Sequence, residues 1–138
     1  MTDLDARSVT RAEARRRLLE LGQSKVDTEY AMHDLVAQWG SDFRPPWVVH
    51  PVLQRVAGGY VYIRWRLSGV NGRQPFVDPA GESGKTLLRS VSPEMVDLLR
   101  KYWRRTLDLN VAHSVAHGEW QRWERYLSDR EQVDAYAG

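Results

Sequence analysis

A run of nine residues, Gly59 to Leu67, alternates strictly between apolar side chains and side chains that can bind anions or aromatic rings. Successive side chains of a β-strand point to opposite faces, so the odd and even positions lie on different faces. The odd positions are apolar and predict a core face: Val61, Ile63, Trp65 and Leu67. Phenol rings stack on nucleobases, and guanidinium groups bind phosphate or carboxylate. The even positions therefore predict a surface for nucleic acid or for an acidic protein: Tyr60, Tyr62, Arg64 and Arg66.

A predicted helix carries four more basic residues: Arg100, Lys101, Arg104 and Arg105. Residues four apart share a helix face, so Arg100 and Arg104 form one row and Lys101 and Arg105 form an adjacent one. Residues 55–105 carry ten Lys/Arg and four Asp/Glu, against seven and eight before them and three and six after them. If the helix begins beside the polar face of the strand, both groups form one cationic, aromatic-lined surface. A solvated helix face remains the simpler interpretation of the two rows.

The segment Pro79 to Thr86 resembles the phosphate loop of nucleotide hydrolases, in the Gly-Glu-Ser-Gly-Lys form of heterotrimeric G-protein alpha subunits. That loop needs a glycine five positions before its Gly-Lys pair, where this chain has Pro79. Proline removes an N–H from a loop that directs N–H groups at phosphate. No convincing buried strand precedes the segment either. We therefore expect a flexible, glycine-rich loop, with no nucleotide cofactor.

His113 and His117 have the i, i+4 spacing that can place two imidazoles on one metal ion. Ser114 stands where the corresponding metalloprotease motif has its glutamate, and Glu119 faces elsewhere on a helix. Two ring residues at a helix interface are the better interpretation, with no metal site. The chain also lacks cysteine and a Gly-x-Ser-x-Gly elbow. We therefore predict no catalytic residues and a protein that is not an enzyme.

Composition indicates a single globular domain over residues 1–138, with residues 1–10 as a disordered tail. Hydrophobic residues make up 42% of the chain and charged residues 28%. The acidic N-terminus lacks the apolar core of a signal peptide, and no apolar run approaches the roughly 20 residues of a membrane span. We therefore expect a cytoplasmic protein without a membrane partner.

Two N-terminal helices are predicted. The first runs from Arg11 to Leu21, with Thr10 and Glu13 as a capping box and Gly22 as its stop. The second covers Asp27 to Trp39 and ends at Gly40.

After Gly58-Gly59 we expect a small β-hairpin. It consists of the alternating strand that ends at Leu67, called the Tyr/Arg strand below, an Asn71-Gly72 turn, and a weak returning strand over residues 74–77. The segment Val52 to Val56 is either a short helical turn or an edge segment.

From Ser92 onward the pattern favours a long helix to about Tyr126, or two helices joined near Asp108–Asn110 or at Gly118. We predict an α+β fold, mostly helical: the two N-terminal helices, the small hairpin, and this long C-terminal helix or helical hairpin packed on the apolar face of the sheet.

The tract Gly58 to Leu127 resembles uncharacterised proteins of integrative and conjugative elements, some of them described as integrase regulators. The resemblance lies in Ile63-Arg64-Trp65-Arg66 and in the segment Leu109 to His117. It covers about half of the chain and implies an accessory protein of a mobile element. The resemblance implies no catalytic residue for this chain, because none is known for the family.

Two functional hypotheses remain. The first is a non-enzymatic protein that binds nucleic acid, or regulates its processing, through the Tyr/Arg strand face and the basic helix rows. The second is a protein–protein interaction module, either an inhibitor or adaptor of a host complex or a homodimer. The residues expected at a dimer interface are aromatic: Trp120, Trp123 and Tyr126.

Overall fold

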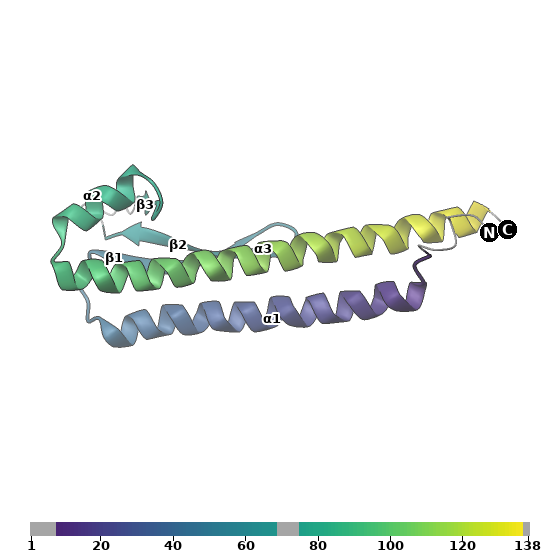
Figure 1. Cartoon of the computed structure of the whole chain (residues 1–138), viewed down its shortest axis with the longest axis horizontal. Coiled ribbons are helices and arrows are strands. Elements are labelled where there is room, and N and C mark those ends of the chain that lie inside the picture. Colours follow the sequence, from purple (N-terminus) through teal and green to yellow (C-terminus); the bar gives the residue numbers. More distant parts are fainter. Residues whose placement is uncertain (1–7, 69–74, 137–138) are drawn as a thin grey trace.

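The chain forms an antiparallel pair of long helices with a small sheet against one face of the pair (Figure 1). In the computed structural model, residues 8–68 and 75–136 are described. The elements follow in the order α1 (Arg11–Asp42), β1 (Val49–Val56), β2 (Tyr60–Leu67), β3 (Phe76–Val77), α2 (Glu82–Ser90) and α3 (Pro93–Tyr136). The mostly helical α+β class, with a long C-terminal helix, is confirmed. No helix of the described residues has the length and apolar content that a membrane-spanning segment needs.

The prediction of two N-terminal helices is wrong, because α1 runs unbroken for 32 residues through both Gly22 and Gly40. A glycine inside a helix costs about 1 kcal/mol relative to alanine. Packing of α1 against α3 on both sides of Gly22 offsets this cost. The predicted start is confirmed, since Thr10 Oγ1 accepts a hydrogen bond from Glu13 N at 3.0 Å.

The two long helices pack along a coiled-coil seam, in which inward residues alternate at spacings of four and three. Every residue of this seam is buried or half-buried. Because the seam is continuous, α3 is one helix of 44 residues, the first of the two predicted alternatives. The seam of α1 comprises Ala14, Leu18, Leu21, Lys25, Thr28, Met32, Leu35 and Trp39, and that of α3 comprises Leu99, Tyr102, Thr106, Leu109, His113, Ala116, Trp120 and Trp123.

The sheet has three antiparallel strands in the order β1-β2-β3. Strand β1 pairs with β2 along its whole length, from Val49↔Leu67 to Val56↔Tyr60. The connecting turn contains Gly58 and Gly59, whose φ angles of 92° and 89° favour glycine. The segment Val52 to Val56, left open between a helical turn and an edge segment, thus belongs to an eight-residue edge strand that begins three residues earlier, at Val49. The predicted Asn71-Gly72 turn lies outside the described residues.

The inner face of β2 packs against α3, as the alternation predicts. Val61, Ile63 and Trp65 are at most 3% exposed, and Leu67 is half-buried against the same core. The Trp65 indole N–H donates to Thr106 Oγ1 at 3.0 Å, and its ring meets Trp39 edge-on with centroids 4.9 Å apart. This aromatic core holds β2 in position. The even-numbered side chains begin on the other face of β2, and the Tyr60 ring at the strand's first residue still reaches α3, with ring centroids 5.8 Å from His113 and 6.1 Å from His117.

The segment before α1 contacts the far end of α3. The carbonyl of Val9 accepts hydrogen bonds from Tyr126 Oη at 3.0 Å and from Arg130 at 2.8 Å. Residues 8–10 of the predicted N-terminal tail therefore have defined positions, while residues 1–7 lie outside the described residues.

Candidate nucleic-acid interface

The outer face of the sheet carries a row of aromatic rings and guanidinium groups along β2. Tyr60 and Tyr62 stack with ring centroids 5.3 Å apart. Farther along, the guanidinium carbons of Arg64 and Arg66 lie 3.2 and 4.5 Å from the ring centroid of Phe76 on β3. All five side chains are half-buried. The four residues predicted from the strand alternation thus lie on one face, joined there by Phe76.

This face is positively charged because the strands contain no Asp or Glu. Arg64 donates to the amide oxygen of Gln54 at 3.2 Å, and His50 lies opposite Arg66 across the ladder. Burial and the nearby charge of Arg66 lower the pKa of His50, so this imidazole is neutral at neutral pH. Among the described residues, neither Arg64 nor Arg66 forms an ion pair. Both guanidinium charges therefore lack a carboxylate partner.

Side chains of α3 hold the edge of β2 that β3 leaves uncovered. Strand β3 pairs with β2 only at Trp65 and Arg66. At Ile63 the side-chain amide of Asn110 makes the two hydrogen bonds that a neighbouring strand would otherwise make. Asn110 Oδ1 accepts from Ile63 N at 2.8 Å, and Asn110 Nδ2 donates to Ile63 O at 3.0 Å. The next turn contributes His113, whose Nδ1 accepts from Val61 N at 3.5 Å. The α3 helix thereby fixes where the Tyr/Arg row lies.

His113 sits in a buried polar cluster beneath the β1–β2 turn. Because Nδ1 accepts from the backbone, Nε2 carries the proton and faces Glu29 Oε1 at 3.3 Å. Burial lowers the pKa of His113 despite this carboxylate. Arg55 also pairs with Glu29, at 3.6 Å. The neutral imidazole is thus an acceptor that holds the turn end of β2 on α3.

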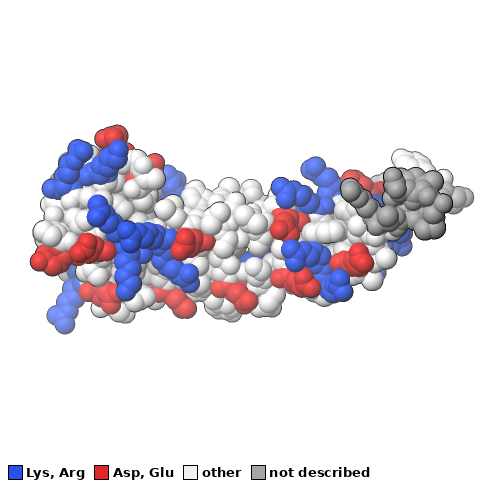
Figure 2. All heavy atoms as spheres, viewed as in Figure 1, with Lys and Arg blue, Asp and Glu red and all other residues white. Residues whose placement is uncertain are grey.

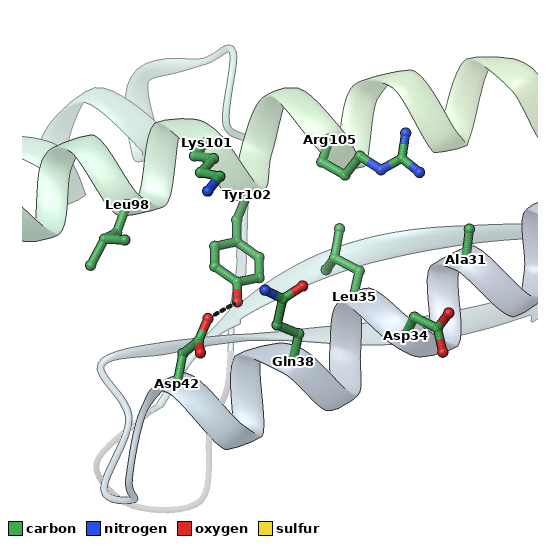
Figure 3. A pocket seen from close by; sticks show the side chains of 9 residues that line it. All are labelled: Ala31, Asp34, Leu35, Gln38, Asp42, Leu98, Lys101, Tyr102 and Arg105. Atoms are coloured by element: carbon green, nitrogen blue, oxygen red, sulfur yellow. Dashed lines mark hydrogen bonds between the residues drawn. The ribbon is translucent and has the colours of Figure 1, made fainter.

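The four basic residues of α3 do not all share the face of the Tyr/Arg row. Trp103 and Asn110 contact the sheet, and Lys101 and Arg105 lie two residues on either side of Trp103. Two residues correspond to about 200° of helix rotation, so these two side chains leave α3 on the opposite side. There they line a cleft between α1 and α3, together with Asp34 (Figure 3). The single cationic surface expected from all eight residues is therefore divided by the helix layer.

Arg100 and Arg104 are exposed and project between these two sides of α3. Lys and Arg side chains gather over the half of α3 that is nearer α2 (Figure 2). Within residues 8–68 and 75–136, none of the four basic residues of this segment forms an ion pair.

The aromatic residues expected at a dimer interface face α1 of the same chain. Lys25 lies over the ring of Trp120 at 4.6 Å, and Trp120 stacks on His117. Trp123 contacts Tyr126 edge-on, and Tyr126 donates to the Val9 carbonyl. All three predicted interface residues are half-buried by these contacts within the chain.

The segment that resembles a phosphate loop is the start of helix α2, where a flexible loop was expected. A Cβ on Gly81 would lie 2.7 Å from Asp78 Oδ2, and one on Gly84 would lie 2.5 Å from the Asp78 carbonyl oxygen. The Asp78 carboxylate accepts from Ala80 N, and Ser83 Oγ accepts from Asp78 N. The glycines therefore make room for Asp78. A carboxylate that occupies the backbone N–H of Ala80 and lies against Gly81 disfavours a phosphate group there.

His113 and His117 stack with ring centroids 6.3 Å apart, and both are buried. In the described part of the chain, no three His, Cys, Asp or Glu side chains come together in a group that could hold a metal ion. Burial lowers the pKa of His117, and the positive charge of Lys25 lowers it further. The pair packs in the interface between α3 and β2.

Reasoning from the sequence missed Asn110 as the residue that holds the strand edge. A signal for it exists, since Trp103, Asn110 and His117 recur every seven residues on the flank of the seam that faces the sheet.

Comparisons of the chain with protein-family models, with curated proteins and with solved structures find no match.

Proposed function

We propose that the protein is a non-enzymatic nucleic-acid-binding protein that uses the outer face of its sheet. One observation carries the proposal: the stacked tyrosines and the two arginines over Phe76 lie in one row, on strands without a carboxylate. Nucleobases stack on such rings, and phosphates pair with such guanidinium groups.

The shape of the face favours a single strand over a duplex. Successive bases of an unpaired strand can lie flat along β2, whereas a duplex presents its phosphates and hides its base faces. Base–aromatic stacking contributes about 1–3 kcal/mol per base and tolerates many sequences. Tyr60 and Tyr62 would supply the stacking surface, and Arg64 and Arg66 would contact the backbone. Binding of this kind suits the accessory role in a mobile element that the resemblance implies, and we include that role in the proposal.

Fluorescence anisotropy with labelled single-stranded and double-stranded oligonucleotides, each titrated over a range of salt concentrations, tests the proposal. Replacing both guanidinium groups in Arg64→Ala/Arg66→Ala should weaken single-strand binding by at least about tenfold. It should also reduce the slope of log K against log salt by about 1.4, which corresponds to two phosphate contacts. Tyr60→Leu/Tyr62→Leu should weaken binding without changing that slope.

Arg122→Ala/Arg125→Ala is the matched control, because it removes the same charge from exposed positions on the far half of α3. This variant should retain the affinity and salt slope of the parent to within a small factor. If Arg64→Ala/Arg66→Ala binds with the affinity and slope of the parent, the sheet face is not the binding surface.

A further inference from the structure

The helix pair has a second long face, on the side away from the sheet. The sheet covers the flank that includes Trp103 and Asn110, and no described element lies over the other flank (Figure 1). Two hollows follow one another along this open face, with volumes of about 240 and 420 Å³. The first lies between Leu35 and Tyr102, and the second between Leu21 and Ala116. The open face is thus a groove that runs along the seam between α1 and α3.

The floor of the groove is apolar, and its rim carries apolar side chains among charged ones. Leu21, Leu35 and Ala116 are buried in the seam at its floor, and Leu98, Val111 and Val115 stand at its rim with 40%, 59% and 57% of their surfaces exposed. A band of uncharged side chains crosses the middle of this face between two charged regions (Figure 2). Branched apolar side chains in such a band favour contact with another protein surface.

Charged side chains line both walls of the groove. At one end the α3 wall carries Lys101 and Arg105, and the α1 wall carries Asp34 and Asp42 (Figure 3). At the other end the charges are paired: Arg17 of α1 joins Glu119 of α3 at 2.8 Å and Glu20 of α1 at 3.1 Å.

At the first end the opposite charges remain unpaired across the groove. Among the described residues, no ion pair joins Lys101 or Arg105 to either aspartate. The Asp42 carboxylate instead accepts a hydrogen bond from the Tyr102 hydroxyl. These charges are therefore available to an opposing surface.

We infer that this groove is the interface of a homodimer. A two-fold axis parallel to the helices places α1 of each copy over α3 of the other at the same level. Asp34 of one copy then faces Lys101 and Arg105 of its partner, and the same contacts recur on the other side of the axis. The four helices form an antiparallel bundle with one sheet on each outer side. A nucleic acid fits this groove poorly, since the carboxylates of Asp34 and Asp42 would repel phosphate.

The groove is large enough for a stable dimer. From Leu98 to Glu119, α3 extends for about 33 Å, and two adjacent helices are about 20 Å wide. A flat strip of these dimensions has an area of about 660 Å² on each copy, close to the roughly 800 Å² per partner of a standard interface. The dimer leaves both Tyr/Arg faces outward, so the inference is independent of the proposed nucleic-acid binding.

Sedimentation equilibrium of the full chain tests this inference. The parent should be a dimer at micromolar concentration, and Lys101→Glu/Arg105→Glu should raise the dimer dissociation constant at least about 100-fold, because attraction becomes repulsion on both sides of the axis. The matched control is Lys85→Glu/Arg89→Glu, the same pair of residue types four apart on the exposed surface of α2, and it should remain dimeric. Circular dichroism should show that both variants fold as the parent does.

A mixing experiment tests the pairing itself. Asp34→Lys should weaken the dimer alone, and an equimolar mixture with Lys101→Glu/Arg105→Glu should form a heterodimer more strongly than either variant forms a homodimer. A parent that is monomeric at about 100 µM overturns the inference. So does a dimer that Lys101→Glu/Arg105→Glu leaves intact. Arg64→Ala/Arg66→Ala should leave dimerisation unchanged, so failure of one proposal is distinguishable from failure of the other.

Discussion

Asn110→Leu tests whether an α3 side chain holds the open edge of β2. Leucine has the same number and branching of side-chain heavy atoms, but it removes both hydrogen bonds between the Asn110 amide and the Ile63 backbone. The Ile63 side chain is 3% exposed and faces the core, so its backbone N–H and C=O lose their partners in a poorly hydrated place. Each unsatisfied buried group costs about 1–3 kcal/mol.

Since Asn110 itself is half-buried, water can reach part of this site, and we take the lower half of that range. The expected loss in the free energy of unfolding is about 3 kcal/mol for the two groups. For a chain of this size, a loss of this magnitude lowers Tm by about 10 °C. The measurements are urea unfolding followed by circular dichroism and amide hydrogen exchange of Ile63, whose protection should fall more than that of the α3 amides.

Two further variants sharpen the test. Asn110→Asp keeps the acceptor for Ile63 N but places a carboxylate oxygen against the carbonyl oxygen of Ile63. Because these two oxygens repel each other, the pKa of the introduced carboxyl should rise in the folded state. The stability of this variant relative to the parent should therefore improve as pH falls and the introduced carboxyl gains a proton. Ser114→Ala, at an exposed position of α3 outside the groove, should change stability by less than about 0.5 kcal/mol. If Asn110→Leu unfolds at the same urea concentration as the parent, the Asn110 bonds contribute nothing.

Stability should fall as pH drops below about 6.5, because burial lowers the pKa of three folded-state histidines and the unfolded chain therefore takes up protons first. These are His50, His113 and His117. Urea unfolding between about pH 7.5 and 5.5 measures how the free energy of unfolding depends on pH, and this dependence should be weaker for His113→Gln than for the parent. His33→Gln, on the exposed surface of α1, is the control. An equal pH dependence for all three proteins would contradict this reasoning. Gly84→Ala should destabilise the start of α2 by more than 1 kcal/mol, since its Cβ would lie 2.5 Å from the Asp78 carbonyl oxygen. Gly22→Ala should instead raise the free energy of unfolding by up to about 1 kcal/mol, since its Cβ meets nothing within 4 Å; thermal unfolding that ranks these two variants in the opposite order would refute the packing argument.

The local features of the fold were predictable from the sequence. Strict alternation assigned Val61, Ile63 and Trp65 to the core face of a strand, and all three are buried. The caps were predictable as well, because they depend on hydrogen bonds within four residues. Ser92 Oγ accepts from Met95 N at 3.3 Å, as its place before Pro93 predicts.

The N-terminal helices were misjudged because the stop signal at Gly22 is a local preference of about 1 kcal/mol. It competes with packing against α3, about 90 residues farther along the chain, which local reasoning cannot weigh. The segment Val52 to Val56 was left open between a helical turn and an edge segment for a similar reason. Pro51 and the paired glycines obscured β1, yet the turn at Gly58-Gly59 brings it alongside β2 over eight residues.

The candidate binding surfaces also depend partly on local sequence and partly on tertiary packing. By itself, the sequence determined that Tyr60, Tyr62, Arg64 and Arg66 share one strand face, because a period of two is a property of the extended backbone. Only the tertiary structure decided that Phe76 joins this row and that Lys101 and Arg105 lie beyond the helix layer. The rotation of α3 about its own axis determines which of its side chains meet the sheet. That rotation is set by the packing of Trp103, Asn110 and His113 against β2 and α1, contacts that bridge 38 residues of chain or more.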